Sequence, residues 1–222
     1  MKKVTVMITT FNRRDCLYEL TKELKRLYPC TIVVVDDAST ESPNNEFIDI
    51  YYRFGKNNGK EGWGNVCAKL WRMSLRTKAD YYIQMVDDAL PNENFFTDSI
   101  RLFESIYDSS KIAMHLANNG REMNWTNFKR VDYSDELYLT NTTETSCIAL
   151  PEFFNRAIRV KGSRWDKNPN LGSGVFGLLC NKWHSNKRTI YGVKKSLLRQ
   201  NPNADISQMN LEERKKNKWK IL

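Results

Sequence analysis

Two apolar runs in the first half of the chain each end in a pair of adjacent aspartates. The pairs are Asp36 and Asp37 after residues 31–35 (TIVVV), and Asp87 and Asp88 after residues 81–86 (YYIQMV). Continuous apolar runs of this kind are typical of strands that are buried on both faces of a parallel sheet. Open α/β sheets bind their ligands outside the carboxyl ends of the strands. The two pairs therefore predict one site, with a nucleotide at the first pair and a divalent cation at the second.

Strand-like and helix-like segments alternate along the first 116 residues. Leucines at positions 17, 20, 24 and 27 have the spacing of one helix face, and Pro29 ends that segment. The expected strands are residues 3–9, 31–35, 47–54, 81–86 and 111–116, and the expected helices are residues 14–28, 65–77 and 93–107. This alternation predicts an α/β fold with a doubly wound, mostly parallel sheet and helices on both faces.

The second half of the chain is less regular. We expect strands at 137–140, 146–150 and 188–193, helices at 151–160 and 171–183, a polar loop at 162–170 and a basic tail from residue 210. Pro151 suits the first position of a helix. No internal repeat or low-complexity linker divides the 222 residues, so we expect one domain.

The formal net charge of +9 suits an anionic partner, either nucleic acid or an acidic membrane surface. An AT-rich genome would produce the same enrichment in lysine and asparagine. No run approaches the roughly 20 apolar residues that span a bilayer. The first residues enter a strand at once, so we expect neither a signal peptide nor a transmembrane segment. Five scattered cysteines without CxxC spacing favour reduced thiols in a cytoplasmic protein.

Three segments resemble the family-2-like glycosyltransferases of the GT-A fold. Residues 4–13 (VTVMITTFNR) are similar to that family's opening strand and T-x-[YF]-N-R turn. Residues 34–40 (VVDDAST) are similar to its V-V-D-D-G-S-T segment, and residues 86–89 (VDDA) to its DxD-type metal motif. The first two segments together are specific, and the resemblance covers residues 4–90. It implies a transferase that moves a hexosyl or pentosyl group from a nucleotide-diphosphate sugar, for example a UDP-sugar, to an acceptor hydroxyl.

The resemblance also implies a division of labour along the chain. Residues 1–116 would form the nucleotide-sugar half, and residues 117–222 the acceptor half. Thr9, Thr10 and Phe11 would lie beside the base and ribose, with Arg13 near the phosphates. The other implied donor-binding residues are Asp36, Asp37, Ser39, Asn65 and Asp87. Asp37 would accept a hydrogen bond from a base N–H.

Plain structural roles compete with some of these assignments. Aspartate and serine also favour turns and helix caps, so Asp36 to Ser39 can form a turn without touching a ligand. Asn65 can equally be a helix N-cap. The functional interpretation of the first acidic pair is favoured because a second pair follows its own strand.

The resemblance places a divalent cation, Mn²⁺ or Mg²⁺, at Asp88, with Asp87 contacting the cation or the ribose. Such a cation neutralises the charge that develops on the leaving diphosphate. Residues 196–200 (SLLRQ) look like the S-L-V-Q-H-type segment of small phage or bacterial members, whose His helps to hold the metal. Gln200 stands at that position here and is a weaker, neutral ligand, and His184 is an alternative.

An inverting transfer needs a carboxylate that takes the proton of the acceptor hydroxyl. Asp166, before the expected helix at 171–183, and Glu144, before the expected strand at 146–150, are the two candidates. Either can instead be a surface acid in a loop, and a retaining transfer needs no such base.

Basic residues are interleaved with aromatic ones in the second half of the chain. The expected acceptor-binding residues are Trp125, Arg159, Lys161, Arg164, Trp165 and Lys167. Phosphate contacts and stacking on an extruded base would require this combination. It favours double-stranded DNA with a hydroxymethylated pyrimidine as the acceptor, as in phage DNA modification, and no obligate protein partner is evident.

Three other functions stay open. A surface glycan or lipid-linked sugar is the competing acceptor, with the cationic face on anionic lipid. A non-catalytic nucleic-acid-binding protein on a transferase fold is disfavoured by the intact second acidic pair. A nucleotidyltransferase is disfavoured because residues 9–12 (TTFN) form no Gly-rich phosphate loop.

Overall fold

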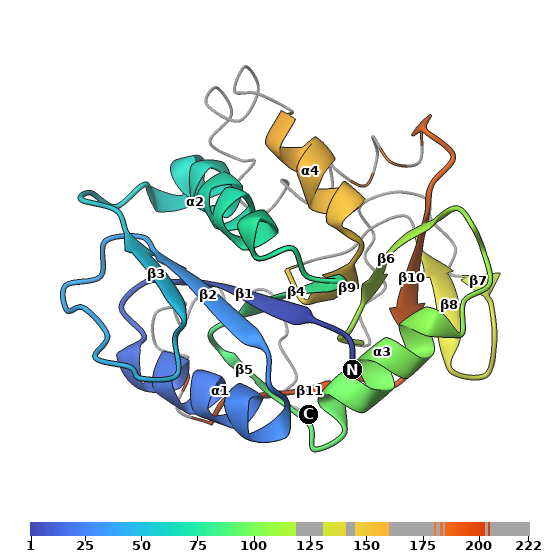
Figure 1. Cartoon of the computed structure of the whole chain (residues 1–222), viewed down its shortest axis with the longest axis horizontal. Coiled ribbons are helices and arrows are strands. Elements are labelled where there is room, and N and C mark those ends of the chain that lie inside the picture. Colours follow the sequence, from blue (N-terminus) through green and yellow to red (C-terminus); the bar gives the residue numbers. More distant parts are fainter. Residues whose placement is uncertain are drawn as a thin grey trace, which may run out of the picture.

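The computed structural model describes residues 1–118, 131–140, 145–159, 180, 183, 185–202 and 204. Within these residues the chain has three layers, with one large sheet between two pairs of helices (Figure 1). The expected helix at 171–183 falls almost entirely outside the described residues. The polar loop at 162–170 and the tail from residue 210 fall wholly outside them.

The large sheet in the described part of the chain has nine strands in the order β3-β2-β1-β4-β9-β6-β10-β8-β7. The strands are β1 (Val4–Thr10), β2 (Thr31–Asp36), β3 (Ile50–Arg53), β4 (Tyr81–Val86), β6 (Lys111–His115), β7 (Val131–Asp132), β8 (Leu137–Thr140), β9 (Cys147–Ala149) and β10 (Thr189–Val193). Pairing is antiparallel only around β9 and β8, so seven of the nine strands point the same way. The mixed, largely parallel sheet that the alternation predicts is confirmed.

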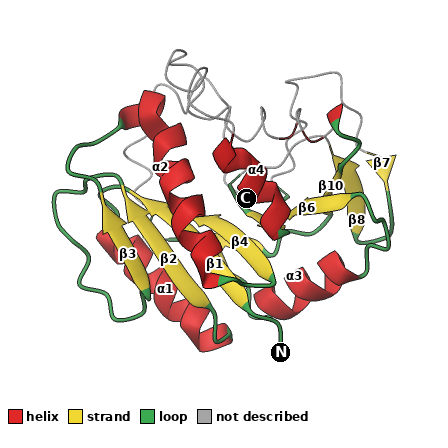
Figure 2. Cartoon of the chain, turned by 45° about the horizontal axis from the view of Figure 1, so that its top comes forward, coloured by secondary structure: helices red, strands yellow, loops and turns green. Residues whose placement is uncertain are grey.

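Helices lie on both faces of the sheet, as expected (Figure 2). α1 (Arg14–Leu27) and α3 (Phe95–Glu104) cover one face, and α2 (Gly59–Ser74) and α4 (Pro151–Arg159) cover the other. Successive side chains of a strand point to opposite faces. In β1, Val6 and Ile8 therefore join the core under α1 and α3, whereas Met7 joins the core under α2 and α4. Two apolar cores thus hold the central strands in place.

The start of α2 differs from the sequence expectation by six residues. The helix begins at Gly59, not at Asn65, and ends before a 3₁₀ turn, η1 (Leu75–Thr77). Three glycines in the first six residues lower the helix propensity of this segment and hide its start. Gly59 has a φ of 65°, which glycine adopts without strain, and its N–H donates to the Asn57 side chain at 2.8 Å. Tertiary contacts of the preceding turn, described below, fix this start.

A second, two-stranded sheet lies beside the site and gave no signal in the sequence. It pairs β5 (Ala89–Pro91) with β11 (Leu198–Gln200) in antiparallel register, Gln200 opposite Ala89. Both strands have three residues, and β5 ends in a proline, which disfavours strands. The pairing brings a segment more than a hundred residues away in sequence next to Asp88.

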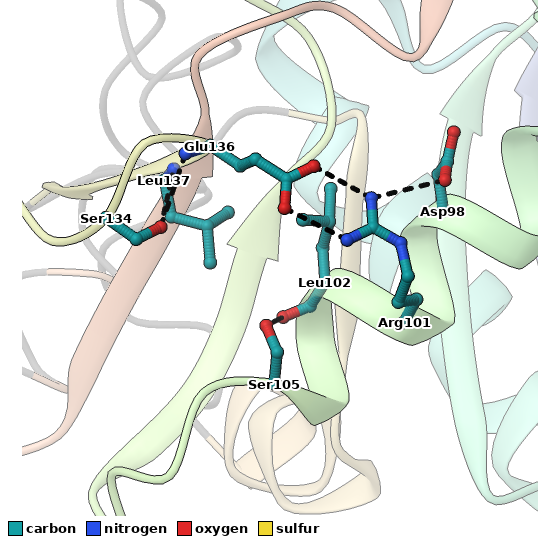
Figure 3. A network of polar contacts seen from close by, with 7 residues as sticks. All are labelled: Asp98, Arg101, Leu102, Ser105, Ser134, Glu136 and Leu137. Atoms are coloured by element: carbon teal, nitrogen blue, oxygen red, sulfur yellow. Dashed lines mark hydrogen bonds and ion pairs between the residues drawn. The ribbon is translucent and has the colours of Figure 1, made fainter.

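A network of ion pairs links α3 to the β7–β8 hairpin on the outer surface (Figure 3). Arg101 donates to both carboxylate oxygens of Glu136, at 2.9 and 2.8 Å, and to Asp98 at 3.3 Å. Ser134 closes the turn of the hairpin by accepting the N–H of Leu137 at 3.1 Å. We call Asp98, Arg101 and Glu136 the α3 ion-pair network.

The helices in the described part of the chain are each too short or too polar to cross a membrane. All five cysteine side chains are buried, as expected for structural thiols.

Candidate donor and metal site

The site begins where the parallel strands β1, β2 and β4 end. Their register pairs Thr10 with Asp36 and Thr9 with Val86, so the residues that follow each strand emerge at one edge of the sheet. The backbone N–H of Asp37 still donates to the carbonyl of Thr10, at 2.9 Å. The sheet thus brings together the two acidic pairs that the sequence places fifty residues apart.

The turn after β1 is tied to the loop after β2. Asn12 has a φ of 54°, a left-handed conformation that asparagine tolerates better than most residues. Its backbone N–H donates to the Ser39 hydroxyl, and its side-chain oxygen accepts the N–H of Thr40, both at 2.8 Å. The two loops consequently form one wall of the site.

Asp36 stabilises the loop after β2 through hydrogen bonds from Ser39 and Tyr51. It is fully buried, and one oxygen accepts the Ser39 N–H and hydroxyl at 2.8 and 2.6 Å. The other oxygen accepts the Tyr51 hydroxyl at 2.7 Å. Burial and the neighbouring Asp36 carboxylate raise the pKa of Tyr51, which keeps this donor protonated. The contacts favour a loop-holding role for Asp36 over a direct ligand contact.

Asp37 connects β2 to the start of α2. One of its oxygens accepts the backbone N–H of Asn58 at 2.9 Å and the Asn58 amide at 2.6 Å. Asn57 donates to the Asp37 carbonyl at 3.0 Å and to the other carboxylate oxygen at 3.3 Å. A base N–H directed at Asp37 would have to share an oxygen that already accepts these bonds.

The second acidic pair has one buried and one exposed member. Asp87 is 5% exposed, and its two oxygens accept the Thr10 hydroxyl at 2.7 Å and an Arg13 N–H at 3.0 Å. Burial raises the pKa of Asp87 to about 6, against the opposing effects of Arg13 and Thr10. The Asp88 side chain is 43% exposed and contacts the same Arg13 nitrogen at 3.2 Å.

The Arg13 guanidinium therefore bridges both carboxylates of the pair. Its side chain is 26% exposed, so it lies partly in solvent at the edge of the sheet. Burial alone would lower the pKa of Arg13, but Asp87 and Asp88 outweigh it and raise the pKa. One positive charge thus stands where the sequence resemblance places a cation and a diphosphate.

The β5–β11 pairing places Gln200 beside the acidic pair. The Asn201 backbone N–H donates to the Asp88 carbonyl at 2.8 Å, which fixes the two segments together. Gln200 itself is exposed. Asn201 is buried, and its amide donates to the Cys16 carbonyl at 3.4 Å.

The oxygen donors at this edge fit a hard divalent cation. Asp88 offers a half-exposed carboxylate. Gln200 carries an amide oxygen and lies opposite Ala89, the residue after Asp88. No group of three or more His, Cys, Asp or Glu side chains with metal-ligand geometry occurs among the described residues. Mg²⁺ is typically held by one or two carboxylates together with substrate phosphates and water. The residues therefore fit a cation that binds together with a diphosphate.

A pocket of about 150 Å³ opens beside Asp36, between the β1 turn, the start of α1 and the loop after β2. It is lined by Thr10, Asn12, Arg14, Leu17, Asp36, Ser39, Thr40, Glu41 and Pro43. Pockets for whole ligands of drug size are typically about 300 to 1,000 Å³. This one has room for part of a nucleotide.

The other expected site residues are distributed unevenly. Thr9 is half-buried at the end of β1, and Phe11 is 39% exposed beside it. Asn65 lies inside α2 and is exposed, so the N-cap interpretation was wrong because the helix starts earlier. Glu144, Asp166, His184, Trp125, Lys161, Arg164, Trp165 and Lys167 lie outside the described residues, and of Arg159 only the backbone is described.

Sequence reasoning missed several residues that shape the site. Asn12 and Tyr51 hold the loops after β1 and β2, and Asn57 and Asn58 hold Asp37. Residues 57–59 (NNG) have the composition of a turn, but the sequence does not show which residues such a turn contacts. Only the strand order shows that this turn lies against Asp37.

Comparisons with known proteins agree with this architecture. The model of the family described as Glycosyl transferase family 2 matches residues 5–158. No curated protein matches the chain significantly. A protein from STIV of known crystal structure is 14% identical, with a TM-score of 0.51, over 88% of this chain and 83% of its own. That likeness shows the fold.

Two further solved structures have lower TM-scores. The mannosyltransferase PcManGT from Pyrobaculum calidifontis, in complex with GDP-Man and Mn²⁺, is 16% identical over 70% of this chain, with a TM-score of 0.48. This chain spans only 46% of that protein's length. Glucosyl-3-phosphoglycerate synthase from Mycobacterium tuberculosis, in complex with Mn²⁺ and UDP-glucose, is 12% identical, with a TM-score of 0.43. The match covers 68% of this chain and 57% of the synthase.

The family model spans well over half of the chain, and its matched region contains both acidic pairs and the strands that carry them. The sheet order and the convergence of the three strand ends agree with the GT-A architecture. The chain belongs to the enzyme family Glycosyl transferase family 2.

Proposed function

We propose that this protein transfers a sugar from a nucleoside-diphosphate sugar to an acceptor hydroxyl with the help of a divalent cation. One observation carries the proposal. The half-exposed Asp88 lies beside Arg13 at the edge where β1, β2 and β4 end. A carboxylate that can bind a cation and a guanidinium that can bind phosphate are therefore close together, as a diphosphate and its cation would require.

The reaction exchanges one bond at the anomeric carbon. The acceptor oxygen forms the new bond to that carbon, and the bond to the diphosphate breaks with its electron pair leaving on the diphosphate. The acceptor proton goes to a carboxylate base if configuration is inverted. Asp166 and Glu144 remain our proposals for that base. A cation at Asp88, with Gln200 nearby, would supply the charge neutralisation that the leaving group needs.

The remaining residues bind and position the donor in this proposal. Phe11 offers an exposed ring beside the strand ends, suited to stacking on a base. Arg13 donates to phosphate oxygens, and Asp87, which is itself held by the Thr10 hydroxyl, orients it. Asp37 accepts a hydrogen bond from an N–H of the base through an oxygen that also accepts a bond from Asn57 or Asn58.

A screen of nucleotide sugars tests the donor. UDP-glucose, UDP-N-acetylglucosamine, GDP-mannose and a pentosyl donor are incubated with the protein and Mn²⁺, and release of the nucleoside diphosphate is measured without an acceptor. At least one donor should be hydrolysed slowly, and chelation should stop it. If none is hydrolysed and none raises the melting temperature, the nucleotide-sugar proposal is wrong.

For the acceptor we propose a hydroxymethylated pyrimidine in double-stranded DNA. The net charge of +9 and the interleaved basic and aromatic residues of the second half support it. The test is a gel-shift titration of the duplex across salt concentrations. Binding should fall steeply with salt, and changing Arg159, Lys161, Arg164 and Lys167 together should flatten the slope while donor hydrolysis persists. A protein that binds no DNA at low salt would favour a surface glycan as the acceptor.

A further inference from the structure

Arg13 occupies the space between the two carboxylates that the donor's cation needs. A single guanidinium nitrogen lies 3.0 Å from an Asp87 oxygen and 3.2 Å from an Asp88 oxygen. The second Asp87 oxygen accepts the Thr10 hydroxyl. Both oxygens of Asp87 are therefore engaged, whereas the Asp88 side chain pairs with Arg13 and is 43% exposed. The structure is thus arranged around an internal cation.

We propose that Arg13 is a resident cation of the acidic pair, which keeps divalent metal from binding tightly until a nucleoside diphosphate draws the guanidinium away. This inference rests on the proposed function, because the diphosphate is what Arg13 would move to. Asp87, which also accepts the Thr10 hydroxyl, holds Arg13 in the donor-free protein, and Asp88 is the carboxylate for which Arg13 and the metal compete.

Electrostatics gives the exchange its direction. Two cations a few ångströms apart repel each other, so the donor-free protein binds metal weakly while Arg13 stays on Asp88. A guanidinium makes charge-assisted, two-pronged bonds with phosphate, and moving to the diphosphate frees Asp88. Metal and nucleoside diphosphate then bind cooperatively, and each raises the affinity for the other by the same factor.

The half-buried position of Arg13 makes the movement feasible. Its side chain is 26% exposed, and Asp88 is 43% exposed, so the pair faces solvent and a ligand can reach it. Asp87 stays buried with the Thr10 bond in place when Arg13 turns. The exchange therefore needs a side-chain rotation and no change in the sheet.

The test measures Mn²⁺ binding to the nucleotide-free protein by electron paramagnetic resonance of the free ion. Arg13→Gln should bind Mn²⁺ about tenfold more tightly than the parent, because it removes a neighbouring positive charge. Arg13→Lys should bind a few-fold more tightly, since the shorter lysine side chain carries a more strongly hydrated ammonium that reaches the two carboxylates less well than the guanidinium nitrogen. Thermal unfolding checks that each variant folds. If Arg13→Gln does not fold, the Mn²⁺ affinity of Arg13→Lys alone tests the proposal.

Arg14→Gln is the matched control. It removes the same charge from the next residue, whose guanidinium pairs with Glu41 at 3.1 Å on the exposed rim. Its Mn²⁺ affinity should stay close to that of the parent. Equal affinity in the parent and both Arg13 variants would overturn the proposal. An equal gain in Arg14→Gln would also overturn it, because net charge alone would then explain the effect.

Calorimetry with UDP and GDP at saturating Mn²⁺ tests where the guanidinium goes. Arg13→Gln should bind the nucleotide that the parent binds at least several-fold more weakly. Unchanged nucleotide affinity beside tighter Mn²⁺ binding would overturn the transfer of Arg13 to the diphosphate. If the parent binds neither nucleotide, the proposed donor class fails, while the nucleotide-free Mn²⁺ comparison still decides whether Arg13 holds the metal off.

Discussion

Asp87 and Asp108 show how differently two regions of this molecule treat a carboxylate. At the end of β4, burial raises the pKa of Asp87 to about 6 even though Arg13 and Thr10 bond to it. Beside β6, burial opposes ionisation of Asp108 as well. There the bonds from Ser110 and Tyr191 outweigh burial and hold the pKa at about 2. The fold therefore stabilises the charged form of Asp108 and disfavours the charged form of Asp87.

The same contrast separates two arginines that each bridge two acids. Arg101 joins Asp98 and Glu136 on the surface, where solvent weakens such pairs (Figure 3). Arg13 joins Asp87 and Asp88 at the strand ends, where Arg13 is half-buried and Asp87 is buried. Perturbed acids in a water-excluded position cluster at functional sites. This difference in burial supports our proposal that the strand-end acids take part in the chemistry, whereas the outer acids attach α3 to the β7–β8 hairpin.

Asp88→Ala should have the largest effect, and it should act on activity alone. Removing the half-exposed carboxylate deletes the proposed cation ligand, so transfer should fall on the order of 10²-fold or more. Stability should change little, because the side chain is solvent-accessible. Donor hydrolysis and thermal unfolding measure the two quantities. The control is Asp98→Asn in the α3 ion-pair network, which should keep full activity. Equal activity in the two variants would contradict the contrast between the regions.

Asp37→Ala should lower both nucleotide affinity and stability. The carboxylate accepts three hydrogen bonds from Asn57 and Asn58, and leaving these donors unsatisfied should cost about 1 to 3 kcal/mol of stability. The matched variant is Asn58→Ala, which loosens the start of α2 but keeps the carboxylate. Calorimetry with the nucleoside diphosphate separates the roles. An equal loss of affinity in both variants would mean that Asp37 acts through α2 and does not contact the base.

The sequence predicted those parts of the fold that depend on local patterns. The runs at 31–35 and 81–86 became β2 and β4 because continuous apolar residues fit a sheet covered on both faces. The helix predicted from the leucine spacing is confirmed as α1, and the leucine face of that helix packs against the sheet. The ends of these strands, and so the place of both acidic pairs, followed directly.

Features that depend on distant partners were not predictable. The start of α2 is set by bonds between Asn58 and Asp37, and β5 exists only because β11 pairs with it. The bridging position of Arg13 requires β1 and β4 to be neighbours, which strand order alone decides. Local propensity carries no information about such contacts, so the residue types were recognised while their pairings were not.

Asp108→Asn should produce a smaller effect that depends on pH. The folded pKa of about 2 lies below the roughly 3.9 of an unfolded aspartate, so Asp108 contributes stability above pH 4. That contribution is lost as the pH falls from 4 to 2. The melting temperature of the variant should therefore lie below that of the parent at pH 7 and approach it near pH 2. A difference that stays constant across this range would show that the charge of Asp108 contributes nothing.

The smallest effect is expected in the α3 ion-pair network. Glu136→Gln removes the carboxylate that Arg101 contacts with two nitrogens, and Arg101→Met removes the guanidinium. Exposed pairs typically contribute about 0.2 to 1 kcal/mol, and the two-pronged geometry favours the upper end of that range. A double-mutant cycle by urea unfolding isolates the pair from other losses, because the coupling is the amount by which the double variant departs from additivity. Donor hydrolysis should be unchanged in all three variants, since the network lies on α3 and the β7–β8 hairpin, away from the strand-end acids. A coupling well above 1 kcal/mol would mean that solvent does not weaken this ion pair as expected. Reduced hydrolysis would mean that this surface is connected to the site and that the two regions are not separate.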